Sequence, residues 1–586
     1  MHSCHSDQHT RSFGALHSDL PNRLCLDECE LESDCTIAKI IEQVDRSSAE
    51  DMFWDNLSGK LLDTSRVQKA RLEEMGELAK HGVYQKVPVS ECWNRTGKGP
   101  IGTRWVDVNK GDDANPDYRS RLVAQEINDS KREDLFAATP PLESKKMLFS
   151  LAVTEGIGYN QGAKSSGHQL DFIDVRRAYF HALARRTVYV RLPDEDAEPN
   201  MCGRLVKALY GTRDAAQNWE HAYIEFLEST GFASGVASPC MFVHESRSLR
   251  VVVHGDDFTV LGPSSQLDWF REQIAARFEV KFRGRLGPES LSSNSIRILN
   301  RVVQWTPEGI RYEADQRHAE IIVAELGLGP MAKPVSTPST QTKNADEEPL
   351  EPTSATVYRA LAARANYLAQ DRVDIAFAVK ELCRHMSNPR NCDWDALKRL
   401  GRYLINRTRV VVHFDYQPMP QSLDIWTDTD HAGCLSTRKS TSGGVAMFGS
   451  HCLKSWSVNQ QVIALSSGEA EYYGLVKGSS NALGLIGMLK DVGIDLAITL
   501  HTDASAAKGI ANRRGLGKVR HIELCQLWLQ DQVARGRIAV VKVRGEDNFS
   551  DSLTKHSNPD RLEQTLASTN QHIGSGRHPI MPEVAR

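Results

Sequence analysis

Two stretches decide the fold: HQLDFIDVRRAYF at residues 168–180 and LRVVVHGDDFTVLG at residues 249–262. The first reads as an apolar strand that ends at Asp174 and runs into a helix, and the second as two apolar strands that meet at His254-Gly-Asp-Asp257. For the hairpin alone a solvated turn is a sufficient interpretation, because Asp is common in turns. Adjacent carboxylates beside apolar strands are nevertheless costly unless a cation neutralises them. With Asp174 facing the tip, three carboxylates could hold two divalent ions about 3.5–4 Å apart.

The composition permits stable cores and excludes several classes of protein. The chain has 586 residues, 40% of them apolar and 25% charged, which suggests about three to five domains and argues against wholesale disorder. A net charge of -4 excludes a uniformly basic nucleic-acid binder but not an enzyme with a basic groove. We find no apolar run of about 18 residues and no signal-peptide pattern at the polar start, and the 12 cysteines are scattered. We therefore expect an intracellular protein, cytoplasmic or nuclear, that is neither secreted nor bound to a membrane.

Residues 1–79 are polar, and we expect a poorly ordered extension with a helix over about residues 66–80. Cys25 and Cys29, with histidines upstream, lack the regular spacing of zinc fingers, so the spacing disfavours a zinc site. A polar extension that binds no metal is the simpler interpretation.

Beyond residue 80 the pattern is a β/α mixture with antiparallel hairpins. Short apolar runs with Gly, Asn and Pro turns alternate with helical stretches such as residues 142–156 and 215–231. This order differs from a repeating βαβ array. Five prolines between residues 329 and 352 indicate a linker, and helical stretches follow it. A further set of strands and helices begins near residue 421.

These motifs, in this order, resemble the reverse transcriptase and ribonuclease H region of copia-type retrotransposon polyproteins. Asp174-Val-Arg-Arg-Ala-Tyr-Phe180 is similar to the first carboxylate motif of reverse transcriptases, and His254-Gly-Asp-Asp257 to their aromatic-x-Asp-Asp motif. The resemblance runs from about residue 80 to about residue 556. Further matching segments are Arg104-Trp-Val, Arg121-Leu-Val-Ala, Leu205-Val-Lys-Ala-Leu-Tyr-Gly211, Trp219, Tyr358-Arg359, Tyr367-Leu368, Asp374-Ile-Ala-Phe-Ala-Val379 and Asn388-Pro389.

The resemblance implies an α+β fold in which a right-hand polymerase is followed by an α/β ribonuclease H-like domain. It implies an RNA-directed DNA polymerase with hybrid-specific ribonuclease H activity, which takes an RNA template, a DNA primer, an RNA–DNA hybrid and deoxynucleoside triphosphates. The sequence leaves the oligomeric state open. The expected divisions are an extension at 1–79, fingers, palm and thumb at 80–328, a proline-rich linker and helical connection at 329–420, a ribonuclease H-like domain at 421–560 and a tail at 561–586.

The resemblance also implies roles for residues of the polymerase. Asp174, Asp256 and Asp257 would be the catalytic carboxylates and would bind two Mg²⁺ or Mn²⁺ ions. The ring of Tyr179 would crowd the 2′ position of an incoming nucleotide, although core packing would explain this residue without the motif. The sequence departs from the family at His254, at Ala216 and in a longer loop, Gln161–Gly167. The other expected nucleotide contacts are Tyr210, Gly211, Arg119 and Arg121, of which the arginines could equally be a solvated strand face.

A second set of four acids marks the C-terminal part of the chain. Each lies at the end of an expected strand or helix, and four carboxylates without thiol or imidazole partners favour Mg²⁺ or Mn²⁺ over zinc. Scattered surface acids are the alternative for any one alone. The local sequences resemble the ribonuclease H domain of copia-type elements, which implies two ions here as well. The acids are Asp428, Glu471, Asp503 and Asp551, and a basic cluster that could contact a hybrid backbone or form a solvated face is Arg513, Arg514, Lys518, Arg520 and His521.

Two other classes of function stay open. We find no Asp-Ser/Thr-Gly protease motif in a credible setting and no His-His-Cys-Cys or Cys-Cys-His-Cys module, so we expect a fragment or genomic relic of a mobile element. The main alternative is a weak or inactive nucleic-acid-binding remnant, although all seven carboxylates are retained. A host regulatory or scaffold protein would instead require an ordered, partner-binding N-terminal region.

Overall fold

The computed structural model describes most of the chain beyond residue 51. The described residues are 52–56, 59–111, 115–127, 135–288, 294–329, 331–341, 346–434 and 436–582. Cys25 and Cys29 lie outside them. Two compact units make up the chain: Met1–Arg71 with Val106–Ser120, and Leu72–Trp105 with Arg121–Arg586.

The smaller unit is organised around one buried carboxylate. Asp107 accepts hydrogen bonds from Arg71 Nη2 at 2.7 Å and from Ser120 Oγ at 2.6 Å. The helix predicted over about residues 66–80 is confirmed as α2. The elements that contribute to this unit are β1 (Phe53–Trp54), β2 (Leu61–Leu62), α2 (Thr64–His81), β4 (Thr103–Asn109) and β5 (Tyr118–Ala124).

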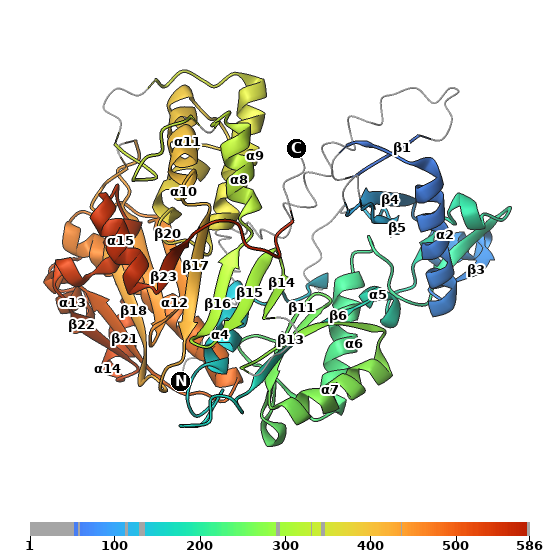
Figure 1. The fold of residues 1–586 in the computed structure, drawn as a ribbon, viewed down its shortest axis with the longest axis horizontal. Helices are drawn as coiled ribbons and strands as arrows, with labels where there is room; N and C mark the ends of the chain where they lie inside the picture. The colour runs from blue at the N-terminus through green and yellow to red at the C-terminus, as the bar shows by residue number, and fades with distance from the viewer. Residues whose placement is uncertain are drawn as a thin grey trace, which may run out of the picture. The chain divides into compact units, whose positions relative to one another are not determined.

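The central sheet of the larger unit contains both stretches that decide the fold (Figure 1). Its side chains alternate between two faces, as strand geometry requires. In the hairpin, Val251 and Val253 belong to one hydrophobic cluster and Val252 to another, so both faces are buried. The six strands, all antiparallel, lie in the order β13 (Val280–Leu286), β6 (Gln169–Val175), β12 (Asp257–Gly262), β11 (Leu249–His254), β10 (Met241–His244) and β9 (Ala233–Ser234).

Helices cover both faces of this sheet. On one face α6 (Ala215–Ser229) and α7 (Ser264–Arg277) pack against the cluster that contains Val251. On the other face α4 (Leu142–Ala152) packs against the cluster that contains Val252. The larger unit also contains a three-stranded sheet of β3 (Tyr84–Pro88), β8 (Met201–Leu205) and β7 (Tyr189–Val190), together with the short helices α3 (Val89–Thr96) and α5 (Ala178–His181).

The connection expected at 329–420 is largely helical and contains one strand, β17 (Arg409–Asp415). Its three predicted helices are confirmed as α9 (Pro352–Ala369), α10 (Ala376–Cys383) and α11 (Asn391–Leu404), which pack with α8 (Arg317–Glu325). A five-stranded antiparallel sheet precedes and follows them, and the sequence did not predict it. Its strands are β14 (Ser295–Ile298), β15 (Arg301–Thr306), β16 (Gly309–Ala314), β17 (Arg409–Asp415) and β23 (Gln571–Gly574).

The C-terminal part contains a mixed sheet. Strands β18, β21 and β22 are parallel, whereas β18, β19 and β20 are antiparallel. Helix α12 packs so closely on it that a Cβ at Gly478 would lie 2.6 Å from Thr427 Cγ2. Among the described residues we find no helix with the length and apolarity that crossing a membrane requires. In spatial order the strands are β20 (His451–Asn459), β19 (Thr441–Phe448), β18 (Ser422–Thr429), β21 (Ala497–Thr502) and β22 (Ile538–Lys542), and the helices are α12 (Ser467–Asp491), α13 (Ser505–Ala511), α14 (Trp528–Ala534) and α15 (Pro559–Ser568).

A buried ion cluster joins three segments that are far apart in the sequence. Asp371, which follows α9, lies 2.6 Å from Lys146 Nζ of α4 and 2.8 Å from Arg301 Nε of β15. All three residues are buried. Burial alone would raise the pKa of Asp371, but the two cations hold it below its ordinary value. The carboxylate therefore stays ionised and compensates both cations.

We expect Asp371→Asn to lower the free energy of unfolding by about 3–5 kcal/mol, because it leaves two buried cations without their anion. Chemical denaturation followed by circular dichroism measures this change. The matched control is Asp395→Asn on the exposed face of α11, which should have little effect. Equal stability of the two variants would contradict the importance of this cluster.

Candidate active sites

The pairing of β6 with β12 brings the first set of acids together. Asp174 lies directly opposite Asp257 in the antiparallel register. The backbone N–H of Val175 donates to the carbonyl of Asp256 at 2.9 Å, which ties the end of β6 to the hairpin tip. The turn needs Gly255, whose φ is +60°.

A tryptophan that the sequence analysis singled out supports this turn. Trp219 lies on α6, and its Nε1–H donates to the carbonyl of Gly255 at 2.8 Å. The indole is buried, so α6 holds the hairpin tip through both packing and a hydrogen bond. Replacement of the family's aromatic residue by His254 leaves this support intact.

Asp174, Asp256 and Asp257 form a compact cluster. One carboxylate oxygen from each residue lies within 4.8 Å of the others. Asp256 is exposed at the tip, yet the surrounding protein removes enough water to raise its pKa, and the charges of Asp257 and Asp174 raise it further. Burial also raises the pKa of Asp257. A cluster of oxygen donors with crowded negative charge suits Mg²⁺ or Mn²⁺.

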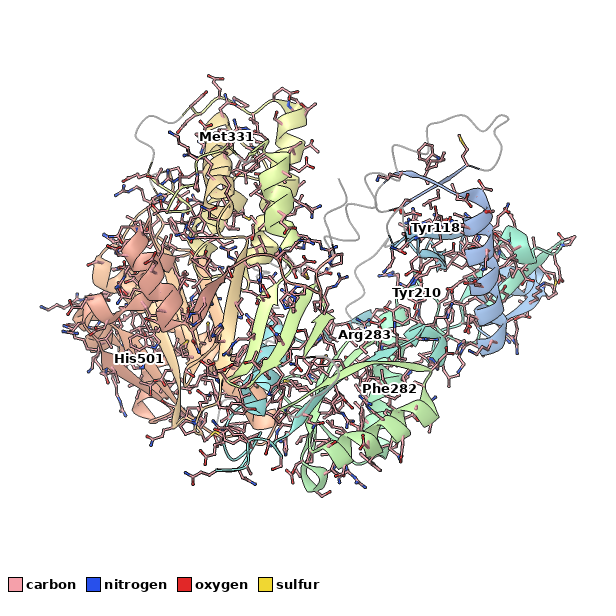
Figure 2. All side chains as sticks on the ribbon, viewed as in Figure 1. Tyr118, Tyr210, Phe282, Arg283, Met331 and His501 are labelled. Atoms are coloured by element: carbon pink, nitrogen blue, oxygen red, sulfur yellow. The ribbon has the colours of Figure 1, made fainter. Side chains whose placement is uncertain are left out.

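Two cations that the sequence analysis missed lie beside these acids. Arg283 Nη2 is 2.5 Å from Asp174 Oδ1 and 3.4 Å from Asp257 Oδ1 (Figure 2 labels Arg283 on β13). Lys145 of α4 is only 3% exposed, and its Nζ has no hydrogen-bond partner in the structure. Burial lowers the pKa of Lys145 to about 8, although the nearby Asp257 opposes that shift. No sequence pattern indicated either residue, because only the tertiary packing brings them to the cluster.

Three of the expected nucleotide contacts form one group. The rings of Tyr179 and Tyr210 are 4.7 Å apart, and the guanidinium of Arg121 lies 4.7 Å from the centre of the Tyr210 ring. Burial raises the pKa of Tyr179, and the charge of Asp256 contributes, so this tyrosine lies near the acid cluster. A Cβ at Gly211 would lie 2.0 Å from the carbonyl oxygen of Ala124, so only glycine fits there.

Arg119 and the loop before β6 have local partners. Arg119 belongs to the smaller unit and pairs with Asp117 at 2.8 Å, so the structure gives it no specific role. The unusually long loop Gln161–Gly167 is followed by His168. The backbone N–H of His168 donates to the carbonyl of Gly158 at 2.6 Å. This bond closes the loop on itself at the start of β6.

The second acid set forms another compact cluster. Asp428 lies on β18, Glu471 on α12 and Asp503 just after β21, and one oxygen from each lies within 4.8 Å of the others. Burial and the neighbouring acids raise the pKa of Asp428 to about 6. Burial and the charges of Asp428 and Asp503 raise the pKa of Glu471 to about 9. One oxygen of Glu471 is buried and has no hydrogen-bond partner in the structure, so this site too suits a divalent ion.

The fourth acid of this set, Asp551, lies outside the group of three. It raises the pKa of Asp428, which places it nearby. Lys555 pairs with its carboxylate, and Arg561 Nε lies 3.6 Å from it. Asp551 is therefore compensated by local cations, and its expected role stays a prediction.

The predicted basic cluster is divided in the structure. Arg514, Lys518 and Arg520 are exposed. Arg513 instead donates to the carbonyl of Leu516 at 2.5 Å. The remaining member, His521, is hydrogen-bonded through Nε2 to the buried Glu469 at 2.8 Å, which anchors the basic segment to the start of α12.

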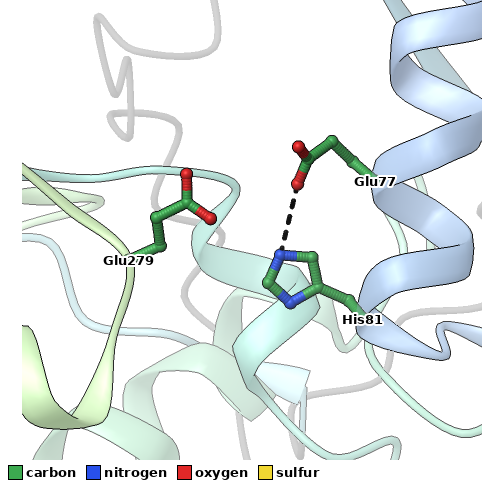
Figure 3. Close-up of side chains that lie close together, drawn as sticks. All are labelled: Glu77, His81 and Glu279. Atoms are coloured by element: carbon green, nitrogen blue, oxygen red, sulfur yellow. Dashed lines mark ion pairs between the residues drawn. The ribbon is translucent and has the colours of Figure 1, made fainter.

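A third group of possible ligands has its own cations. Glu77, His81 and Glu279 lie close together, with His81 Nε2 at 3.5 Å from Glu77 (Figure 3). Lys80 Nζ lies 2.6 Å from Glu279 and 3.4 Å from Glu77. Burial lowers the pKa of His81. Because the chain already neutralises both carboxylates, we assign no metal to this group.

Comparisons with known proteins match part of the chain to a reverse transcriptase domain and most of it to transposon polyproteins. Residues 90–292 match the family described as reverse transcriptase (RNA-dependent DNA polymerase). The Pol polyprotein of transposon RE2 from Arabidopsis thaliana is 28% identical over 470 residues, which cover 78% of this chain and 31% of that protein. The Pol polyprotein of transposon TNT 1-94 from Nicotiana tabacum is 24% identical over 517 residues, which cover 84% of this chain and 37% of that protein.

The chain thus spans about a third of the length of these relatives. A solved foamy viral protease-reverse transcriptase in complex with RNA/DNA hybrid aligns with 91% of this chain and 65% of its own, at 10% identity and a TM-score of 0.45. Residues 90–292 therefore match a reverse transcriptase domain, and most of the chain is similar in sequence to the Pol polyproteins of plant transposons.

Proposed function

We propose that the chain is an RNA-directed DNA polymerase with an associated ribonuclease H. The observation that carries the polymerase assignment is the cluster of Asp174, Asp256 and Asp257 inside the matched reverse transcriptase domain. The cluster of Asp428, Glu471 and Asp503 supports a separate nuclease site. The substrates would be an RNA template, a DNA primer and deoxynucleoside triphosphates at the first site, and an RNA–DNA hybrid at the second.

In the polymerase reaction, the primer 3′-hydroxyl attacks the α-phosphorus of a nucleoside triphosphate, a phosphodiester forms, and pyrophosphate leaves. Two divalent ions bound by the acids would lower the pKa of the hydroxyl and neutralise charge on the leaving group. Asp174, Asp256 and Asp257 would hold the reacting oxygens in line by fixing those ions. Tyr179 would border the sugar, and Arg121 could approach the triphosphate.

In the nuclease reaction, water attacks a phosphorus of the RNA strand and the 3′-oxygen of the ribose leaves. Asp428 and Glu471 share crowded negative charge, which a divalent ion would relieve. The exposed Arg514, Lys518 and Arg520 could contact hybrid phosphates. The competing function is a nucleic-acid-binding remnant with little activity, which the pairing of Arg283 with Asp174 favours.

We expect Asp257→Asn to reduce primer extension at least about a hundredfold, because one metal would lose a charged ligand. Incorporation of deoxynucleotides on an RNA template with Mg²⁺ or Mn²⁺ measures it. Glu272→Gln, at an exposed position of α7, is the control and should keep activity. Equal incorporation by the wild type and Asp257→Asn would refute the polymerase assignment, and no incorporation by the wild type would favour the remnant.

The two sites should act independently, because their carboxylates come from different sheets. Asp428→Asn should abolish cleavage of the RNA strand in a hybrid and leave primer extension within about twofold. Asp257→Asn serves as the reciprocal control, with cleavage retained and extension lost. If Asp428→Asn removed both activities in a folded protein, a separate nuclease site would be excluded.

Tyr179→Val should weaken selection against ribonucleotides, since removal of the ring opens space for a 2′-hydroxyl. Tyr179→Phe keeps the ring and should keep the selection. Incorporation of ribo- and deoxynucleotides and the melting temperature should be measured for both variants. If Tyr179 serves only core packing, Tyr179→Val loses stability by an amount typical of core truncation, about 2–5 kcal/mol, without any change in sugar preference.

A further inference from the structure

We propose that Arg283 is the resident counter-cation of the polymerase carboxylates and sets their affinity for divalent metal. In this view a metal ion enters the site only as the guanidinium leaves it. The inference rests on the proposed polymerase function, since it assumes that Asp174 and Asp257 bind metal. It concerns a residue whose role no sequence motif indicated.

The backbone aims Arg283 at the site. Strand β13 pairs with β6 in register at Lys281 and Phe282, and the register then shifts so that Gly284 pairs next. Arg283 is therefore the extra, unpaired residue of a β-bulge. Bulges bend a strand and redirect a side chain, and they recur beside active sites. Gly284 accommodates the bulge with a φ of +152°.

The contact geometry is that of a bridging cation. A single nitrogen, Nη2, lies 2.5 Å from Asp174 Oδ1 and 3.4 Å from Asp257 Oδ1. An ion that bridged the same two carboxylates would need the same space. The guanidinium of arginine keeps its positive charge throughout the neutral pH range. Arg283 therefore competes with a metal ion over that whole range.

Of the two cations at the site, Arg283 is the one that can leave. Its side chain is 35% exposed and reaches the acids from the sheet edge, because β13 is the outermost strand. Lys145 lies on α4 and is only 3% exposed, so it stays close to Asp257. The second acid cluster offers an internal contrast, since the structure places no arginine in an ion pair with Asp428, Glu471 or Asp503 within the described residues.

The test measures metal binding directly, apart from activity. Mn²⁺ binding is followed by electron paramagnetic resonance in an Asp428→Asn background, which weakens the second site. Arg283→Leu should bind Mn²⁺ at least about tenfold more tightly than the parent, because a competing unit charge is removed at contact distance. Without metal, Arg283→Leu should melt at a lower temperature than the parent. Saturating Mn²⁺ should raise the melting temperature of Arg283→Leu by more than it raises that of the parent.

Lys281→Met is the matched control: Lys281 lies directly opposite Asp174 in the strand pairing but forms no ion pair with it in the structure, so this variant removes a nearby charge without removing the contact. It should change the affinity by less than about threefold. Arg283→Lys keeps a charge at this position and should fall between the parent and Arg283→Leu. If Arg283→Leu does not fold, Arg283→Gln replaces it, with the same expectation.

The outcomes separate the inference from the function on which it rests. If Arg283→Leu and the parent bind Mn²⁺ equally while Asp257→Asn weakens binding, the counter-cation role is overturned and the metal site stands. If Arg283→Leu and Lys281→Met tighten binding equally, the effect is one of general charge and the specific role is again overturned. If neither Arg283→Leu nor the parent binds Mn²⁺ at the first site, the proposed polymerase function fails together with the inference.

Discussion

The position of β6 between β13 and β12 is the constraint on which the cluster of Asp174, Asp256 and Asp257 depends. Its pairing with β12 sets Asp174 opposite Asp257, and its pairing with β13 brings Arg283 to the same end. A shift of one residue in either register would turn these side chains to the other face of the sheet. The hydrophobic clusters on both faces prevent such a shift, because every apolar residue of β6 would move with the charged ones.

Both acid clusters bring several carboxylates close together, but they differ in how far nearby cations compensate the negative charge. In the first cluster, Arg283 and Lys145 lie beside the carboxylates, and the raised pKa values of Asp256 and Asp257 show that the compensation is incomplete. In the C-terminal part, burial and the charges of Asp428 and Asp503 raise the pKa of Glu471 to about 9, which disfavours its ionised form. Crowded carboxylates with little local compensation are the environments in which divalent ions bind strongly, so the second site is the less obstructed of the two.

Hydrogen bonds and buried ion pairs join the sheet that carries the first site to the rest of the larger unit. Asp491, at the end of α12, accepts hydrogen bonds from the backbone N–H groups of Val236, Ala237 and Ser238. Asp371 likewise links α4 to β15, through ion pairs with Lys146 and Arg301. A buried apolar core shared by α4, β15 and α12 holds these segments together, and the charged groups add a defined geometry to each junction.

The sequence by itself determined which residues form the strands and helices near both sites, because alternating and 3.6-residue apolar patterns are local properties. It also indicated the six carboxylates that the structure gathers into two clusters of three, since each ends a recognisable element. It did not reveal the sheet of β14–β17 with β23, in which β17 pairs with β16 and β23 from distant parts of the chain. Nor could it reveal Arg283, Lys145 or the separation of Asp551 from its cluster. Those features depend on strand register, a bulge and helix packing, and only the tertiary structure decides which distant charges come into contact.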